Sequence, residues 1–204
     1  PFWVGELGKA YVQGLHRGSK GRLLVVPRHL PGLGGADRSL EAEVPTVQKT
    51  LEQLRQIELA PFFAVARGAM SDDNVVDGFL VTHIRYRGFQ GNIRQATRPI
   101  SLDAQALQSV MNLPEFAPWR QAGGILVSDN LGLKSIHYSY DPRGLSFNAR
   151  RVAQDALTAG NDLLLLNRFA ADSENWKAHF TNVRDTLSYL ASRYKTEATF
   201  RAIV

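Results

Sequence analysis

A carboxylate at the end of an apolar run is the first feature of this sequence that could do chemistry. Residues 124–127 are apolar or Gly, and Ser128 and Asp129 follow them directly. A short run of this kind is typical of a buried parallel strand, and α/β barrels place catalytic groups at the carboxyl ends of their strands. Asp129 is therefore a candidate nucleophile or electrostatic stabiliser. The alternative is that it caps a helix that begins near Leu131.

Two histidines follow other apolar runs in a similar way. The run 22–28 ends on Arg28 and His29, and the run 78–84 contains His83. In one barrel, both imidazoles and the aspartate would share a rim, where they could bind sugar hydroxyls or a metal ion. The alternative is that the histidines are buried and bonded to backbone carbonyls. Because the sequence has no HxH or HExxH pair, we do not expect a metal site.

The elements that would position these residues alternate along the chain. Four strands are expected, near residues 22–28, 78–84, 124–128 and 162–166. Helical spacing of apolar residues is found between and after them, within 47–58, 102–110, 152–157 and 176–190. Ser101 is a candidate N-cap for the second of these helices. The alternation predicts an α/β fold of parallel strands. A complete (β/α)8 barrel needs about 250 residues and eight strands, so we expect a single domain over 1–204 that holds roughly half of one.

Composition limits the class of protein more than its chemistry. The 204 residues are 44% hydrophobic, enough for one sizeable core, and carry a net charge of +5 that identifies no partner. The chain has no cysteine, which excludes disulfides and thiolate metal sites and leaves the compartment open. No apolar run reaches the ~20 residues of a membrane-spanning helix. Because the chain starts without Met and stops in an apolar pattern, we expect it to be part of a longer protein.

A basic loop with aromatic residues follows the second expected strand. It contains Arg85, Tyr86, Arg87, Phe89, Arg94 and Arg98. Such a loop could contact phosphates and stack on bases, line a sugar site, or be solvated. Because the positive charge is spread over the whole chain, we do not expect a nucleic-acid partner.

Taken in order, these segments resemble the later part of the barrel domain of glycoside hydrolase family 3, in its β-N-acetylglucosaminidase branch. Residues 28–34 resemble the Lys-His-Phe-Pro-Gly-His-Gly motif of that branch, and Thr82-His83 resembles its Thr/Ala-His strand end. Residues 97–102 resemble its Arg-Pro-Ala-Thr-Leu-Ser loop. Residues 124–131 resemble Gly-Val-Ile-Ser-Asp-Asp-Leu, and 156–164 resemble Ala-Leu-x-Ala-Gly-x-Asp-Leu-Leu. The resemblance implies that this chain holds the C-terminal half of a TIM-type barrel.

The resemblance also implies roles for individual residues. Asp129 takes the position of the nucleophile of a retaining glycosidase, and Arg28 and His29 take the positions of a Lys-His pair that binds sugar hydroxyls. His83 is expected to bind substrate at the same rim. A retaining mechanism needs a nucleophilic carboxylate and a separate acid/base about 5 Å from it, and it needs no cofactor.

The sequence departs from the family pattern in the loop that should hold the acid/base. That branch has an Asp-Ser-His triplet there, and Ser39-Leu40-Glu41 occupies its place, so the usual His is missing. Asp37 takes the role of the Asp if the loop is shifted. Glu41 or Glu43 is then a candidate carboxylic acid/base. The alternatives are an acid/base from another part of the protein, or a barrel that has lost catalysis.

Two further departures affect substrate binding. Arg28 replaces a lysine, which is not a conservative exchange where a point charge contacts a hydroxyl. Leu33 replaces the second His of the Lys-His-Phe-Pro-Gly-His-Gly motif.

Our first hypothesis is a retaining exo-β-glycosidase that acts on β-linked N-acetylglucosamine or β-glucoside ends through a covalent intermediate on Asp129. The alternative is an inactive barrel that binds carbohydrate or acts as a scaffold. A metal-dependent hydrolase is disfavoured because further ligands are not in view. The expected partners are a carbohydrate substrate and the remainder of the barrel or another chain, because half a barrel exposes a strand edge. The sequence assigns no compartment.

Overall fold

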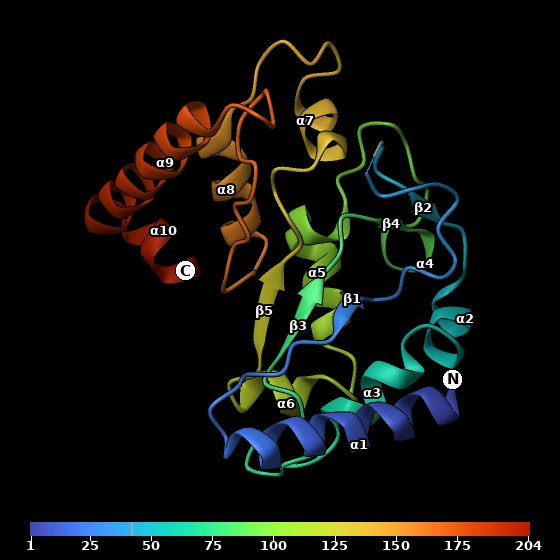
Figure 1. The fold of residues 1–204 in the computed structure, drawn as a ribbon. Coiled ribbons are helices and arrows are strands. Elements are labelled where there is room, and N and C mark those ends of the chain that lie inside the picture. Colours follow the sequence, from blue (N-terminus) through green and yellow to red (C-terminus); the bar gives the residue numbers. More distant parts are fainter. Residues whose placement is uncertain (42) are drawn as a thin grey trace.

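The computed structural model of this chain describes residues 1–41 and 43–204 and has an α/β fold. Three parallel strands form its central sheet, in the order β1 (Arg28–Leu30), β3 (Gly78–Val81) and β5 (Ile125–Ser128). Four residue pairs, from Gly78 with Ile125 to Val81 with Ser128, join β3 to β5. A second sheet pairs β2 (Thr46–Val47) with β4 (Arg85–Tyr86), also in parallel. Because both sheets are parallel, the carboxyl ends of β1, β3 and β5 lie at one edge (Figure 1).

Helices surround this central sheet (Figure 1). In chain order they are α1 (Phe2–Ser19), α2 (Leu51–Gln56), α3 (Ala60–Ala66), α4 (Arg87–Gln90), the 3-10 turn η1 (Ile100–Leu102), α5 (Ala104–Met111), α6 (Ala117–Gln121), α7 (Lys134–Tyr140), α8 (Ala149–Thr158), α9 (Trp176–Thr196) and α10 (Ala198–Ile203). Side chains cap several of them, because the first N–H groups of a helix lack internal partners. Asp103, Asn148 and Asn175 cap α5, α8 and α9.

The expected strand over 22–28 is wrong in its bounds. The ladder strand β1 covers only Arg28–Leu30, although the preceding segment runs beside β3 and the Val25 oxygen accepts hydrogen bonds from the amides of Asp77 and Gly78. Leu23 and Leu24 are exposed, although a short apolar run of this kind is typical of a buried parallel strand. This segment is the outer member of the sheet, so no neighbouring strand in the described part of the chain covers it.

The expected strand over 162–166 is reduced to one parallel bridge between Val127 and Leu163. Ser128 N donates to the Leu163 oxygen at 2.8 Å, so this segment still occupies the fourth position, next to β5. Leu163 is 48% exposed because it lies on the opposite edge of the sheet. The expected helix over 47–58 starts later, at Leu51, since β2 takes the first residues.

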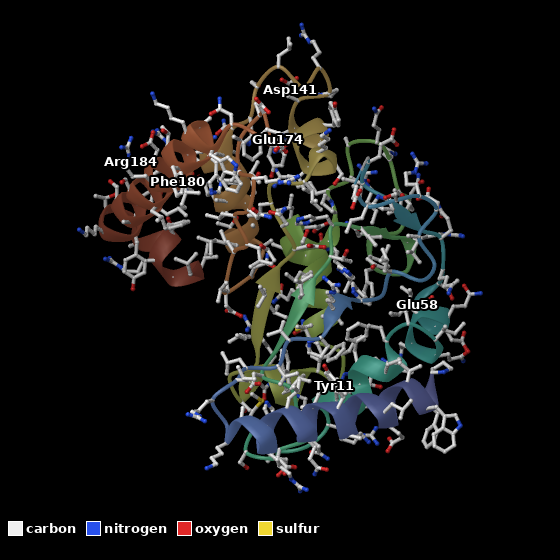
Figure 2. The ribbon with its side chains drawn as sticks, viewed as in Figure 1. Tyr11, Glu58, Asp141, Glu174, Phe180 and Arg184 are labelled. Atoms are coloured by element: carbon white, nitrogen blue, oxygen red, sulfur yellow. The ribbon has the colours of Figure 1, made fainter. Side chains whose placement is uncertain are left out.

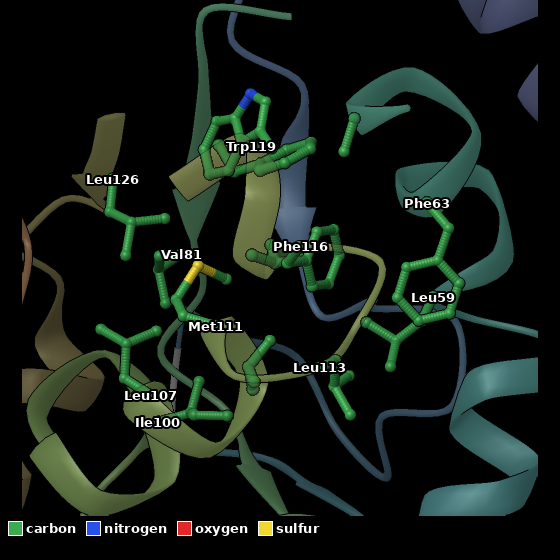
Figure 3. Close-up of a cluster of buried hydrophobic side chains, with 14 of the residues drawn as sticks. Leu59, Phe63, Val81, Ile100, Leu107, Met111, Leu113, Phe116, Trp119 and Leu126 are labelled. Atoms are coloured by element: carbon green, nitrogen blue, oxygen red, sulfur yellow. The ribbon is translucent and has the colours of Figure 1, made fainter. Parts of the chain in front are cut away.

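The core lies between the sheet and helices α3, α5 and α6 (Figure 3). Phe79 of β3 packs against Phe116 and Trp119, with ring centroids 5.6 and 4.6 Å apart. The Trp119 indole N–H donates to the Val76 oxygen at 2.8 Å. A Cβ at Gly124 would lie 2.2 Å from this indole, so the strand that leads to Asp129 requires glycine there.

Helix α1 packs against α3 below the sheet and leaves an apolar cavity of about 590 Å³ beside β1. Tyr11, Leu24 and Phe62 are among its lining residues, and Figure 2 labels Tyr11 on this helix. His16 ties the same helix to the sheet, because its two ring nitrogens lie 2.9 Å from the Asp73 oxygen and from Asp77 Oδ2. No helix of the described residues is long and apolar enough to cross a membrane.

Candidate active site

Asp129 lies directly after β5, at the carboxyl edge of the sheet. Its amide donates to the Val81 oxygen at 2.9 Å, which continues the ladder by one residue and fixes the backbone. Its Oδ1 accepts the Asn130 N–H at 2.8 Å, and 12% of its side chain is exposed. The alternative role as a helix cap is wrong, because α7 begins only at Lys134 and has Leu133 at its N-cap position.

The imidazole of His29 lies beside this carboxylate. Its Nδ1 lies 3.3 Å from Asp129 Oδ2, and 20% of its side chain is exposed. Strands β1 and β5 are not neighbours, so the two side chains meet across β3 at the edge that both strands reach. The structure thus brings together two of the predicted site residues, while Arg28 is exposed and forms no side-chain hydrogen bond or ion pair with the rest of the described chain.

His83 lies behind this pair and is fully buried. Its Nε2 lies 3.1 Å from the backbone oxygen of Asn130, so this nitrogen carries the proton and donates. Its Nδ1 lies 2.6 Å from Ser101 Oγ and accepts the hydroxyl proton. Both ring nitrogens are thus used inside the protein. This geometry favours a positioning role for His83 over the expected contact with a sugar hydroxyl.

Ser101 extends this network, and the sequence interpretation missed its role. The sequence predicts that Ser101 caps a helix, but Asp103 caps α5 and Ser101 lies inside η1. The Asn161 amide donates to the Ser101 backbone oxygen at 2.8 Å and to the Ala156 oxygen at 2.7 Å. No local pattern could reveal this, because Ser101 is 18 residues from His83.

The turn after Asp129 is held by its own side chains. Asn130 Oδ1 accepts the amides of Gly132 and Asn167, each at 3.1 Å. A Cβ at Gly132 would lie 2.0 Å from the Asn167 oxygen, so this close approach requires glycine. The carboxylate therefore projects from a backbone that is fixed on both sides.

The electrostatics of the site favour an ionised Asp129 and a neutral His83. Burial raises the pKa of Asp129, but the interaction with the His29 ring, the nearby His83 and the Asn130 N–H outweigh it and hold the pKa below its ordinary value. Burial lowers the pKa of His83 despite the attraction of Asp129. At neutral pH, Asp129 is an anion and His83 is an uncharged hydrogen-bond donor.

The loop that carries the expected acid/base is built around Asp37. Asp37 Oδ1 accepts the Thr46 amide at 2.8 Å, and Arg38 forms ion pairs with Asp37 and Glu43. Burial raises the pKa of Asp37, but the Thr46 N–H and Arg38 outweigh burial and hold this pKa below its ordinary value. The Asp37 side chain therefore connects the start of this loop to its end at Thr46.

Glu41 is exposed at the tip of this loop. Its amide donates to Ser39 Oγ at 3.3 Å. Its carboxylate forms no hydrogen bond or ion pair with another described residue, Asp129 included. The structure therefore does not join the two predicted catalytic carboxylates.

No group of three His, Asp or Glu side chains that could hold a metal ion occurs within residues 1–41 and 43–204. His29, His83 and Asp129 therefore do not form such a group.

Comparison with known proteins defines the class to which this fold and site belong. Residues 1–193 match the family model described as the glycosyl hydrolase family 3 N terminal domain. The chain therefore belongs to glycoside hydrolase family 3, which confirms the resemblance drawn from its motifs.

Individual relatives agree with this assignment. A β-hexosaminidase from Idiomarina loihiensis is 24% identical over 166 residues, which cover 81% of this chain and 42% of the relative. A family 3 β-N-acetylglucosaminidase from Paenibacillus sp. str. FPU-7 matches 98% of this chain and 32% of its own, with a TM-score of 0.67 and 22% identity. A β-glucoside phosphorylase matches 88% of this chain and 28% of its own, with a TM-score of 0.61 and 16% identity.

These matches have two consequences. The likeness to the solved structures confirms the shared α/β fold. The chain spans between 42% and 50% of the length of the curated relatives that it matches.

Proposed function

We propose that this chain supplies the nucleophile of a retaining β-glycosidase. The observation that carries the proposal is Asp129, a carboxylate held at the end of a central strand. One of its oxygens accepts the Asn130 N–H and the other faces His29. Its lowered pKa keeps it ionised, as a nucleophile requires. The names of the relatives favour β-linked N-acetylglucosamine or β-glucoside ends as substrates.

The reaction would follow the two steps of retaining enzymes. Asp129 Oδ2 attacks the anomeric carbon while the bond to the leaving-group oxygen breaks and an acid protonates that oxygen. Water then attacks the same carbon, and the former acid accepts its proton as the ester to Asp129 breaks. His29 would stabilise the carboxylate between turnovers and, with Arg28, contact the sugar hydroxyls.

We assign the acid/base role to Glu41 rather than Glu43. The Glu43 carboxylate is paired with Arg38, whereas the Glu41 carboxylate has no partner among the described residues. In the productive complex the two catalytic carboxyls would lie about 5 Å apart. The substrate would therefore bring the loop tip toward Asp129.

The proposed parent protein completes the sheet on both sides. Leu24 and Leu163 expose apolar surface on its two edges, and the apolar cavity beside α1 opens next to one of them. The curated relatives are about twice as long as this chain. We propose that this chain forms the C-terminal half of a (β/α)8 barrel and that the rest of the barrel covers these surfaces.

A carbohydrate-binding domain without catalysis is the second candidate, favoured by the missing contact between Glu41 and Asp129. The test uses the full-length parent protein with aryl β-N-acetylglucosaminide and aryl β-glucoside. Release of the aryl group, with the β configuration retained in the first sugar product seen by NMR, supports the glycosidase. Sugar binding by calorimetry without any release, in a folded protein, supports the second candidate. An inverted product contradicts the retaining mechanism.

A further inference from the structure

A turn rich in glycine follows β1 and the candidate site residue His29. We name residues 31–35 the glycine turn, because three of these five residues are glycine. Glycine has the largest conformational freedom of all residues, so a segment of this composition has little stiffness of its own. Contacts from other parts of the chain must therefore fix this turn and, with it, the end of β1.

The strand that carries His29 is irregular at this residue. Arg28 pairs with Leu80 and Leu30 pairs with Val81, so β1 advances by two residues where β3 advances by one. His29 is thus the extra residue of this step, and the ladder leaves it unpaired, as in a β-bulge. Contacts beyond the ladder must therefore help to place its side chain.

The side chain of Glu58 packs against the start of the glycine turn. Glu58 belongs to the connection between α2 and α3 and is 9% exposed (Figure 2). A Cβ at Gly32 would lie 2.6 Å from Glu58 Cβ and 2.8 Å from its Cγ. Gly32 also has a φ of +138°, so its backbone conformation and this close approach both require glycine. The backbone at Gly32 is thus fitted to the side chain of Glu58.

A largely buried ion pair extends this contact to the end of the turn. Lys49 Nζ pairs with Glu58 Oε1, and the side chain of Glu58 is only 6% exposed. A Cβ at Gly35 would lie 3.2 Å from Lys49 Cε and 3.4 Å from Glu58 Oε1. The ion pair therefore lies against Gly35, while the stem of the Glu58 side chain lies against Gly32.

Tyr86 of β4 adds a hydrogen bond to the same turn. Its hydroxyl donates to the Gly32 oxygen at 2.7 Å, and its side chain is fully buried. Burial and the nearby charge of Glu58 raise the pKa of this phenol well above its ordinary value, so the hydroxyl keeps its proton and remains a donor. The connection between α2 and α3 and the strand β4 therefore hold the turn at one residue, Gly32.

The Glu58 carboxylate is an expensive way to stabilise this part of the fold. Its Oε2 is buried and has no hydrogen-bond partner within residues 1–41 and 43–204. Burial of an incompletely compensated charge costs free energy, and apolar residues of similar volume in place of a buried ion pair often leave a protein equally or more stable. The contact with the glycine turn gives this carboxylate a role other than stability.

We propose that Glu58 is a positioning residue that fixes the glycine turn and thereby keeps His29 beside Asp129. Gly32 follows His29 by three residues, and His29 Nδ1 lies 3.3 Å from Asp129 Oδ2. In the described part of the chain, the His29 ring forms no other ion pair, so its place depends on the backbone that carries it. The consequence for turnover rests on the proposed function, in which Asp129 is the nucleophile.

The pKa of Asp129 reports the position of His29 with a definite sign. Burial raises this pKa, and the contact with His29 from β1 is the largest effect that lowers it, followed by His83 from the segment after β3 and the Asn130 N–H. A looser turn lets His29 move away, which raises the pKa of Asp129. The loss of the negative charge of Glu58 would by itself lower that pKa. A rise therefore reports the displaced imidazole and not the lost charge.

The test titrates the Asp129 carboxyl of the full-length protein by carbon NMR, with its signal assigned through Asp129→Asn. Glu58→Gln keeps the stem that packs against Gly32 but removes the ion pair with Lys49. We expect the pKa of Asp129 to rise by about half a unit. The acid limb of the pH profile of kcat/KM for an aryl glycoside should move to higher pH by the same amount.

The matched control is Glu115→Gln. Glu115 also pairs with a cation, Arg55, and also has a buried carboxylate oxygen without a described partner. It is not among the nearest neighbours of Gly32 or Gly35. The control variant should therefore lose a comparable ion pair and keep the wild-type pKa of Asp129.

A second variant, Glu58→Asp, keeps the test decisive if Glu58→Gln does not fold. It retains the charge but withdraws the carboxylate from Lys49 and Gly35 by one methylene, so the pKa of Asp129 should again rise, by less than in Glu58→Gln. An unchanged or lowered pKa of Asp129 in the folded Glu58 variants would overturn the inference, as would an equal rise in Glu115→Gln. A rise in the Glu58 variants alone, in a protein that turns over no glycoside, supports the positioning of His29 while the proposed function fails.

Discussion

The two carboxylates that we propose as nucleophile and acid/base are held in different ways in this molecule. Asp129 is buried and projects from a strand end that β3, Asn130 and Gly132 fix. Glu41 is exposed, and its carboxylate forms no hydrogen bond or ion pair with another described residue. If Asp129 and Glu41 have the roles that we propose, the nucleophile is preorganised before substrate binds, whereas the acid/base is positioned only in the complex.

Replacing Asp129 has the largest expected effect. Asp129→Ala removes the attacking oxygen, and kcat for an aryl glycoside should fall by about 10⁴-fold or more. Asp172→Ala, which removes a carboxylate outside the site, should stay within about twofold of the wild type. Circular dichroism checks that both variants fold. A near wild-type kcat for Asp129→Ala would contradict the role of Asp129 as the nucleophile.

Replacing Glu41 should have a smaller effect that depends on the leaving group. Glu41→Gln should lower kcat by about 10²–10⁴-fold for poor leaving groups, and by less for activated aryl groups that need no protonation. Glu43→Gln disturbs the Arg38 pair and should lack this dependence. Glu52→Gln, on the exposed face of α2, is the control. Equal losses for all leaving groups with Glu41→Gln would show that Glu41 is not the acid.

A substitution of Ser101 tests whether the site around Asp129 depends on the hydrogen bonds of His83. Ser101→Ala removes the donor to His83 Nδ1, which frees the ring to change its tautomer and its bond to the Asn130 oxygen. We expect kcat to fall by about 10–100-fold with little change in KM. Ser101→Thr keeps the hydroxyl and should recover most of the activity, and Ser109→Ala is the matched control.

Nitrogen NMR of the His83 ring distinguishes a positioning role of Ser101 from a general loss of stability, because it reports the tautomer of the ring. The wild type should show the Nε2–H tautomer, and the alanine variant a mixture. Full activity of Ser101→Ala, or a loss that Thr does not recover, would contradict the positioning role.

The smallest expected effect lies at the amino end of the strands, where His16 contacts Asp77, the residue before β3. Burial lowers the pKa of His16, but its hydrogen bonds to Asp77 and to the Asp73 oxygen, with the nearby negative charges, raise it overall. The charged form of His16 therefore stabilises the fold below about pH 6.5, and this contribution is lost as pH rises through the raised pKa.

The measurement is the Tm of the full-length protein between pH 5.5 and 8.5. His16→Gln should flatten the decline of Tm with rising pH, while Asp129→Ala should leave the decline in place. Parallel pH curves for the wild type and His16→Gln would contradict this account of the pair.

The sequence predicts the strand end that carries Asp129 better than the loop that carries Glu41. The apolar run and the Asp that follows it are local signals, so the α/β class and the place of Asp129 after a strand could be predicted. The partners of His83 could not, since Ser101 and Asn130 approach it only through the fold. The bounds of β1 were missed because its ladder depends on the partner strand β3 and not on hydropathy alone. The motifs predicted the family, which the comparisons confirm.

The most direct test of the central claim traps the intermediate on the full-length protein. A 5-fluoro-N-acetylglucosaminyl fluoride slows both steps, so the glycosyl ester accumulates, and mass spectrometry of a digest locates the added sugar. We predict that the sugar is attached to Asp129 and that Asp129→Ala gives no labelled peptide. A label on another residue, in an enzyme that releases the aryl group, would contradict the assignment of Asp129 as the nucleophile.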